Sequence, residues 1–315
     1  MEPALFANSL ALAFSLAAAP TQDNAPVVLR IPPPAPANSG EQMEPAIVPP
    51  EFWAEKCDPW DDWDKPAPPF IVAPGTFYVG TCGITSLLVT TDAGNVLFDT
   101  GTQDGSKVVY ANIRRIGANP RQTKLILTTH EHFDHVGGVA WIQRQTGAPV
   151  AALPIAASVI RSGKADPDDP QAGMHDDMVP SPFVISIADG EPIHVGEVTF
   201  TPIATPGHTP GGTSWHWETC RGGECTSIVY ADSLSPVSSD TYRFSDHPDY
   251  VAKYRAGLDR IAALDCHILL TPHPSHSRMI ERAATGTFEG GMTCAQYADA
   301  KTEALDARIA KETTQ

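Results

Sequence analysis

The run His130-Glu131-His132-Phe133-Asp134-His135 places four side chains that can bind a metal within six residues. It follows the apolar stretch 125–127, so it begins where a buried strand is expected to end. Imidazole and carboxylate are ligands of zinc, and a hydrolytic zinc site uses about three of them and leaves one position for water. The alternative is a solvated polar loop. The density of His and Asp at the end of a strand favours a metal site.

Two further histidines follow strand-like runs in the same way. His208 lies in the Gly/Pro-rich segment 204–212, after the strand-like run 198–201, and His273 lies just past the apolar pair 269–270. Each of these histidines alone is weak evidence. Because all three segments have the form of a strand followed by a His-bearing loop, the side chains are expected to meet at one edge of a sheet. Together they offer six ligands, enough for two metals with three protein ligands each.

The elements that must position these residues alternate between strand and helix from Phe77 onward. Strands are expected at 86–91, 95–99, 125–128, three times within 183–204, at 227–231 and at 267–270. Helices are expected at 107–116, 139–145, 155–161, 250–264 and 295–310. The Asp-, Pro- and Gly-rich segment 163–182 is predicted to be a loop. Strands followed by βα units in two halves predict an α/β fold, a four-layer αββα sandwich.

Three parts are expected along the chain. Residues 1–19 are apolar, end in small residues and are predicted to be a signal peptide, although its usual basic start is missing and its cleavage point stays open. This stretch is too short and too interrupted for a membrane span. Residues 20–50 are proline-rich and predicted to form a mobile leader. Residues 51–315 are predicted to form a single domain that starts with an arm carrying three tryptophans, Trp53, Trp60 and Trp63.

Charge and cysteines limit the function further. The net charge of −16 argues against a nucleic-acid partner, which would need clustered Lys and Arg. Six cysteines allow 15 pairings, and Cys220 and Cys225 flank a Gly-Gly loop across which they can pair. Three bridges would indicate an oxidising compartment. Six reduced cysteines in a cytosolic enzyme are the alternative.

From about residue 52 to the C-terminus, the chain resembles the metallo-β-lactamase superfamily. It is most similar to the third subclass of the class B β-lactamases, which are dizinc enzymes. The resemblance rests on HEHFDH at 130–135, PGHTPGGTSW at 206–215, YADSLS at 230–235 and the segments 264–266 and 271–274. In the other class B enzymes a cysteine is a ligand, and here the matching position is Ser233, which favours the third subclass.

The resemblance implies a metallo-β-lactamase fold with two Zn²⁺ ions per chain. By this resemblance the first zinc is held by three histidines, namely His130, His132 and His208. The second is held by Asp134, His135 and His273, and Asp134 would also steady the hydroxide nucleophile. Ser233 and Ser235 would donate to the carboxylate of the substrate. Asp99, which could otherwise simply cap a turn, would orient a ligand. The pair Cys266–Cys294 matches a bridge of the family, which leaves Cys57 with Cys82.

The function that follows is zinc-dependent hydrolysis of the β-lactam amide bond of penicillins, cephalosporins and carbapenems, by an exported, periplasmic, monomeric enzyme that confers antibiotic resistance. The alternatives are a thioesterase or lactonase of the same fold, or a non-catalytic zinc-binding protein. In the thioesterases and lactonases of the superfamily, a Gly-Asp segment supplies a carboxylate that bridges the metals, and Asp232 could correspond to it. Because YADSLS matches the β-lactamases over a longer stretch, Asp232 is not expected to be a ligand. Glu131 is expected to face away from the metals, and His276 to line the rim of the pocket.

Overall fold

The computed structural model describes residues 47–314. The predicted signal peptide, 1–19, and most of the predicted leader, 20–50, lie outside the described residues. The end of that leader belongs to the fold, because Val48 pairs with Phe70 and helix α1 (Pro50–Lys56) begins within it.

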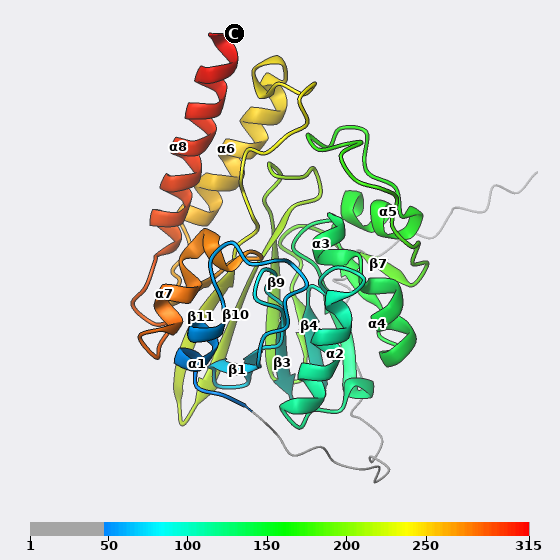
Figure 1. Cartoon of the computed structure of the whole chain (residues 1–315), viewed down its shortest axis with the longest axis vertical. Helices are drawn as coiled ribbons and strands as arrows, with labels where there is room; N and C mark the ends of the chain where they lie inside the picture. The colour runs from blue at the N-terminus through cyan, green and yellow to red at the C-terminus, as the bar shows by residue number, and fades with distance from the viewer. Residues whose placement is uncertain (1–46, 315) are drawn as a thin grey trace, which may run out of the picture.

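Two β-sheets form the centre of the molecule (Figure 1). The first contains β1 (Phe70–Ala73), β2 (Thr76–Tyr78), β3 (Leu87–Thr91), β4 (Gly94–Phe98), β5 (Thr123–Leu127), β6 (Val150–Ala152) and β7 (Val184–Ser186) in that order. The second contains β12 (Ile268–Leu270), β11 (Glu224–Tyr230), β10 (Thr213–Arg221), β9 (Val198–Ala204) and β8 (Ile193–Val195) in that order. Strands β4 to β7 are parallel, as are β11 and β12, and the other neighbours are antiparallel.

Aromatic side chains join the two sheets face to face. The ring of Phe98, at the end of β4, lies 5.7 Å from Phe200 of β9 and 4.9 Å from Trp217 of β10. Trp215 and Tyr230 contact the same ring at 5.9 and 5.8 Å. All five side chains are buried. Buried aromatic clusters of this kind contribute both apolar area and favourable ring geometry, so the sandwich is held together close to where β4 ends.

Helices cover both outer faces of this double sheet. Helices α2 (Gly105–Arg115), α4 (Val139–Thr146) and α5 (Pro154–Ser162) bury apolar residues against the first sheet. Helices α6 (Pro248–Ala262) and α8 (Cys294–Thr313) do the same against the second. Figure 1 shows the resulting layers, which are those of the predicted αββα sandwich.

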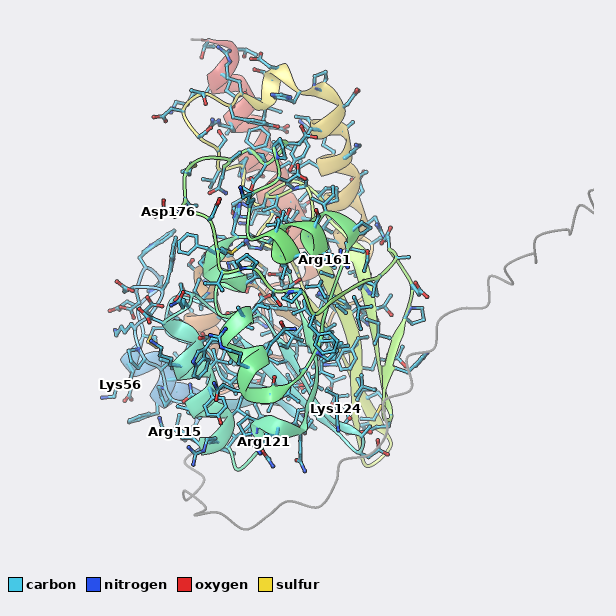
Figure 2. The ribbon with its side chains drawn as sticks, turned by 90° about the vertical axis from the view of Figure 1, so that its right-hand side faces the viewer. Lys56, Arg115, Arg121, Lys124, Arg161 and Asp176 are labelled. Atoms are coloured by element: carbon cyan, nitrogen blue, oxygen red, sulfur yellow. A yellow bond between two sulfur atoms is a disulfide. The ribbon has the colours of Figure 1, made fainter. Side chains whose placement is uncertain are left out.

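The remaining helices are short and lie in connections: α3 (Phe133–Val136), α7 (Met279–Ala283) and the 3-10 turns η1 (Pro120–Gln122), η2 (Phe244–Asp246) and η3 (Pro274–Ser277). The loop predicted at 163–182 contains no helix or strand. Asp176 in this loop and Arg121, just before β5, lie towards opposite ends of the molecule (Figure 2). The loop therefore lies at the end where the strands of the parallel part finish.

The longest strand, β10, was not predicted. It starts directly after the glycines of the His208 loop, and the glycine-rich motif hid its first residues from a sequence-based prediction. Its side chains alternate between the aromatic core and the surface, as expected of a strand.

The three tryptophans of the arm have different environments. Trp53 is buried against Phe70 and Tyr78, Trp60 is 86% exposed, and Trp63 lies beside Phe133.

The six cysteines form three disulfides, Cys57–Cys82, Cys220–Cys225 and Cys266–Cys294. The first ties the arm to the turn after β2, the second closes the β10–β11 hairpin, and the third anchors the start of α8.

Among the described residues, no helix has both the length and the hydropathy needed to cross a bilayer.

The third disulfide should contribute most to stability because it closes the longest loop. Cys266 and Cys294 are 28 residues apart, whereas Cys220 and Cys225 are 5 apart. Replacing both members of a pair by Ser should lower the free energy of unfolding by about 3–4 kcal/mol for the long loop and about 2 kcal/mol for the short one in the chain-entropy model. Denaturant unfolding of the two double variants measures this difference. An equal loss in both would contradict it.

Candidate metal centre

Loops at one end of the sandwich carry the six predicted ligands. The segment 130–135 follows β5 and leads into α3, His208 follows β9, and His273 follows β12. Two hydrogen bonds attach the first loop to the second sheet: the indole Nε1 of Trp215 donates to Thr128 O at 2.9 Å, and Thr213 N donates to Thr129 O at 2.6 Å. The two sheets therefore fix the position of the His-rich run jointly.

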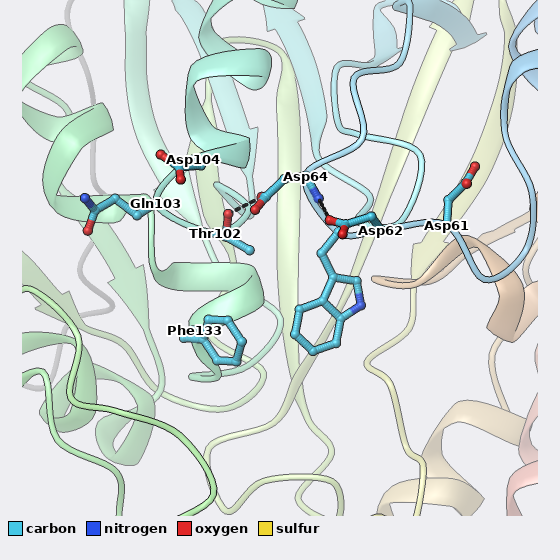
Figure 3. A pocket seen from close by; sticks show the side chains of 8 residues that line it. Asp61, Asp62, Asp64, Thr102, Gln103, Asp104 and Phe133 are labelled. Carbon is cyan, nitrogen blue, oxygen red and sulfur yellow. Dashed lines mark hydrogen bonds between the residues drawn. The ribbon is translucent and has the colours of Figure 1, made fainter.

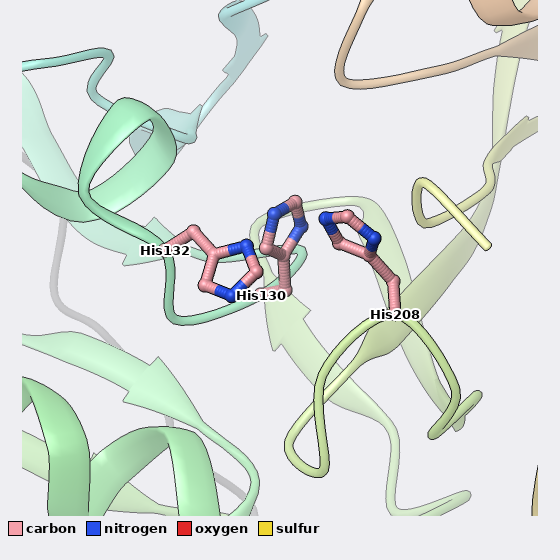
Figure 4. Close-up of side chains that lie close together, drawn as sticks. All are labelled: His130, His132 and His208. Atoms are coloured by element: carbon pink, nitrogen blue, oxygen red, sulfur yellow. The ribbon is translucent and has the colours of Figure 1, made fainter. Parts of the chain in front are cut away.

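His130, His132 and His208 form the first cluster (Figure 4). Each offers one ring nitrogen, and these atoms all lie within 4.8 Å of one another. Their ring centroids are 4.8 to 5.0 Å apart in all three pairs. All three side chains are buried. Three imidazoles that converge in this way can hold one divalent cation.

Asp134, His135 and His273 form the second cluster. Asp134 Oδ2 lies 3.1 Å from His135 Nε2 and 3.3 Å from His273 Nε2. The two histidine nitrogens are themselves 3.3 Å apart. Ligand atoms around a tetrahedral zinc at 2.0–2.1 Å are separated by about 3.3 Å, so this triangle matches three corners of such a site. The rings of His130 and His135 are 4.2 Å apart, which places the two clusters side by side.

The outward nitrogens of the first cluster are all occupied. His130 Nδ1 lies 2.8 Å from Asp232 Oδ1, His132 Nε2 lies 3.0 Å from Asp169 Oδ2, and His208 Nδ1 lies 2.9 Å from Ser235 O. Metal-binding histidines typically give their second nitrogen to a carboxylate or a carbonyl, which sets the tautomer and the ring orientation.

The inward nitrogen of His130 supports the same interpretation. His130 Nε2 is buried and has no hydrogen-bond partner among the described residues. A buried polar atom without a partner is costly, and a divalent cation would satisfy it. The donor set, buried and made of imidazoles and one carboxylate, therefore fits a divalent metal.

Asp99 lies behind the second cluster. Its carboxylate accepts hydrogen bonds from Thr129 N and Thr129 Oγ1, both at 2.8 Å, and from Tyr230 OH at 2.9 Å. Its Oδ2 is 3.5 Å from His135 Nδ1, the nitrogen that faces away from the cluster. Asp99 has a φ of 52°, a left-handed conformation that is rare outside glycine and is often found at functional sites. These contacts are those expected of a residue that orients a ligand.

Burial and the neighbouring charges determine protonation in the clusters. Burial, followed by the charges of neighbouring histidines, lowers the pKa of His130 and of His208 well below the usual value. Both are therefore neutral near pH 7, which is the form that coordinates metals. Burial also acts to lower the pKa of His135, but Asp134 and Asp99 outweigh it and raise that pKa to about 10. Binding of a metal at His135 is then expected to release a proton.

Glu131 does point away from the clusters, but it is not a solvated side chain. It is buried and accepts hydrogen bonds from Thr209 Oγ1 and Gly211 N, both at 2.8 Å. Burial raises its pKa to about 7. Its contacts attach the loop that carries His208 to the run that carries His130, so Glu131 helps to bring the first cluster together.

Three supporting residues were missed by sequence reasoning, namely Asp169, Lys301 and Tyr297. Asp169 comes from the loop 163–182, where nothing in the sequence distinguishes it from its acidic neighbours. The hydroxyl of Tyr297 donates to Asp232 O and Ser233 O, both at 2.7 Å. Lys301 Nζ donates to Ser235 Oγ at 2.7 Å. The last two residues are on α8, remote from every motif.

The predicted substrate-binding serines have different environments. Ser233 is fully buried, and its Oγ has no hydrogen-bond partner among the described residues. Ser235 is partly exposed, and its hydroxyl contacts Ser233 O at 3.2 Å as well as Lys301. His276, predicted at the pocket rim, is partly buried, and its ring lies 4.9 Å from that of His273.

A cavity of about 470 Å³ lies between the arm and the start of α2 (Figure 3). It is lined by Asp61, Asp62, Trp63, Asp64, Thr102, Gln103, Asp104 and Phe133, and none of these belongs to either cluster. The Trp63 ring is 5.4 Å from Phe133 and 6.1 Å from His273, so the arm borders the candidate metal centre through this tryptophan.

Comparisons with known proteins agree with this geometry. The family model described as "Metallo-beta-lactamase superfamily" matches residues 79–273. The MIM-2 metallo-β-lactamase structure is 48% identical, with a TM-score of 0.79 over 84% of this chain and 98% of that chain. MEM-A1, a subclass B3 metallo-β-lactamase from a soil metagenome library, is 35% identical, with a TM-score of 0.77 over 80% of this chain and 99% of that chain.

The chain is also similar to curated sequences with a different description. A hydroxyacylglutathione hydrolase of Bradyrhizobium sp. (strain ORS 278) is 27% identical over 130 residues, which are 41% of this chain and 43% of that hydrolase. The chain thus matches less than half the length of this relative.

The contact between His130 and Asp232 predicts an effect on metal affinity. Asp232→Asn keeps the volume but replaces the carboxyl group that contacts His130 Nδ1, so metal affinity should fall roughly 10- to 100-fold. Competition with a chromophoric chelator measures this. Asp259→Asn, an exposed change on α6, is the control and should leave affinity unchanged. Equal affinities in the two variants would show that Asp232 does not support the ligand.

Proposed function

Because this chain belongs to the metallo-β-lactamase superfamily and is a hydrolase of that superfamily, we propose that it hydrolyses the amide bond of β-lactams with two bound zinc ions. The observation that carries the proposal is the adjacency of two three-residue clusters built without cysteine. In this proposal, the first zinc is bound by His130, His132 and His208. The second is bound by the three residues Asp134, His135 and His273.

The chain's own residues prepare this centre in defined ways. Bound zinc supplies a Lewis acid and lowers the pKa of a coordinated water to about 7, so no protein base is needed to form the nucleophile. Asp134 would be a ligand of the second zinc and would also steady the hydroxide nucleophile. Asp99, Asp169 and Asp232 hold the ligand rings in position. Burial of the clusters keeps bulk water away and strengthens their electrostatic effect on the substrate.

The choice of β-lactams over other substrates is supported by the extent of the likeness. The MIM-2 metallo-β-lactamase and the subclass B3 enzyme MEM-A1 align over nearly their whole length, whereas the hydroxyacylglutathione hydrolase aligns over less than half of its own. The three disulfides favour an oxidising compartment. Export to the periplasm and a role in antibiotic resistance are part of the same proposal.

Thioester hydrolysis is the second candidate, supported by the curated relatives. In that case Asp232 would be the carboxylate that bridges the metals. Its Oδ1 instead lies on Nδ1 of His130, whereas Nε2 is the nitrogen of that ring without a partner. This arrangement favours a role in orienting His130 and so favours the β-lactamase proposal.

Purified protein tested on a chromogenic cephalosporin, a carbapenem and an acyl-glutathione thioester distinguishes these candidates. We expect hydrolysis of the two β-lactams, little or no hydrolysis of the thioester, and two zinc ions per chain by elemental analysis. A chelator should abolish activity, and added zinc should restore it. Turnover of the thioester alone would favour the second candidate. Fully active protein with a single metal would contradict the dizinc scheme.

His208→Ala should remove at least about a thousandfold of the β-lactamase activity, because a charge-stabilising metal contributes several kcal/mol to the transition state. The fold should remain, since the core and the disulfides are untouched. His194→Ala is the matched control: His194 is exposed on β8, and its ring contacts Thr199 Oγ1 at 2.9 Å. Zinc content and kcat/KM of both variants are compared. Loss of activity in both would point to a general effect of removing a histidine.

A further inference from the structure

Lys301 is a partly buried cation placed beside a predicted substrate-binding residue. It lies on the inner side of α8, and its Nζ donates to Ser235 Oγ at 2.7 Å. The carbonyl oxygen of the same Ser235 accepts from His208 Nδ1 at 2.9 Å. Ser235 therefore contacts both the Lys301 ammonium and His208, a proposed zinc ligand.

The Lys301 charge has no protein counterion. Among the described residues, no carboxylate oxygen lies within ion-pair distance of Lys301 Nζ. Its other close neighbour is the ring of Tyr297, whose centroid is 5.2 Å from Nζ. Moving a cation out of water without pairing it is costly, so an anion from outside the chain would be stabilised here.

Further unpaired polar atoms occur in the same region. Ser233 Oγ and His276 Nδ1 are buried and have no hydrogen-bond partner among the described residues. The Lys301 charge lies close enough to His276 to lower its pKa, second only to burial as a cause. A carboxylate at this place would find a cation together with neutral donors.

We propose that Lys301 binds the carboxylate of the β-lactam substrate, together with Ser235, and so makes the enzyme selective for carboxylated substrates. This inference rests on the proposed β-lactamase function and adds a specificity residue from α8 to it. A local cation is needed because the chain carries a net charge of −16, which repels anions at long range.

The protonation of Lys301 gives the proposal a pH signature. Burial lowers the pKa of Lys301 to about 8, although Asp232 acts in the opposite direction. The titratable groups that face Lys301 are Asp232, Tyr297, His273 and His276. Since Lys301 loses its charge above its pKa, KM for a carboxylated substrate should rise between about pH 8 and pH 10, while KM for an uncharged ester of the same substrate should not.

The decisive experiment compares a chromogenic cephalosporin with its methyl ester, using zinc-loaded enzyme. Lys301→Met should raise KM for the acid at least about tenfold, as expected for losing a hydrogen bond to a charged group. It should change kcat little, leave KM for the ester unchanged and leave zinc content at the wild-type value. Lys301→Arg should recover much of the loss. Ser235→Ala should raise KM for the acid several-fold, and its effect should not add to that of Lys301→Met.

The control is Lys311→Met, an exposed change on the same helix, which should leave KM unchanged. Equal losses on acid and ester, or a KM unaffected by Lys301→Met, would overturn the role of Lys301 while β-lactam hydrolysis itself stands. A wild-type enzyme that hydrolyses neither compound would instead overturn the proposed function, and the role of Lys301 with it. Thermal unfolding of each variant shows whether a change in KM comes from misfolding. If Lys301→Met is misfolded, the test uses Lys301→Arg, which should keep a KM for the acid close to that of the wild type.

Discussion

One end of the sandwich buries a group of imidazole and carboxylate side chains in a small volume, and the surrounding structure must stabilise them there. Five imidazole rings and Asp134 lie side by side there, with adjoining rings 4.2 to 5.0 Å apart. Groups of this kind compete for protons or repel one another unless a shared cation balances them. A divalent metal at each cluster would remove that conflict, and metal binding would then be coupled to the stability of the loops around it.

The sheets give this unfavourable cluster a rigid support. Phe98 ends β4 inside the aromatic core, and the next residue is Asp99, which holds both Thr129 and His135. Trp215 belongs to the same aromatic core and donates to Thr128. The aromatic core that joins the two sheets therefore lies next to residues that contact the proposed ligands. Since closely packed interiors resist displacement, this core would restrict movement of the loops that carry those ligands.

The charged residues around the candidate metal centre fall into two groups, namely three carboxylates beside the cluster histidines and one lysine beside Ser235. Asp99, Asp169 and Asp232 each face an outward nitrogen of a cluster histidine, so they would act on bound metals through that histidine. Lys301 is on the other side of the serine segment, where its charge has no carboxylate partner among the described residues. In the proposed enzyme, the negative groups would act on the metals, and the positive group would remain available to an anionic substrate.

The sequence alone determined the fold and which side chains meet at one end of it. The spacing within 130–135 and the position of His208 and His273 after strands predict both clusters, because side chains at the ends of neighbouring strands necessarily converge. The αββα layers follow from the order of strands and helices. The sequence did not show β10, since its start is hidden in the glycine-rich loop of His208.

Only the tertiary structure decided which residues support those ligands and what faces the substrate. Asp232 meets His130 across 102 residues of chain, Asp169 meets His132 across 37, and Lys301 meets Ser235 across 66. No local pattern marks such pairs, because an isolated Asp or Lys in a loop or on a helix face has the same sequence signature whether it is solvated or buried. The packing of α8 and of the loop 163–182 against the strand ends makes the difference, by bringing these charges out of water and next to a ligand or a substrate donor.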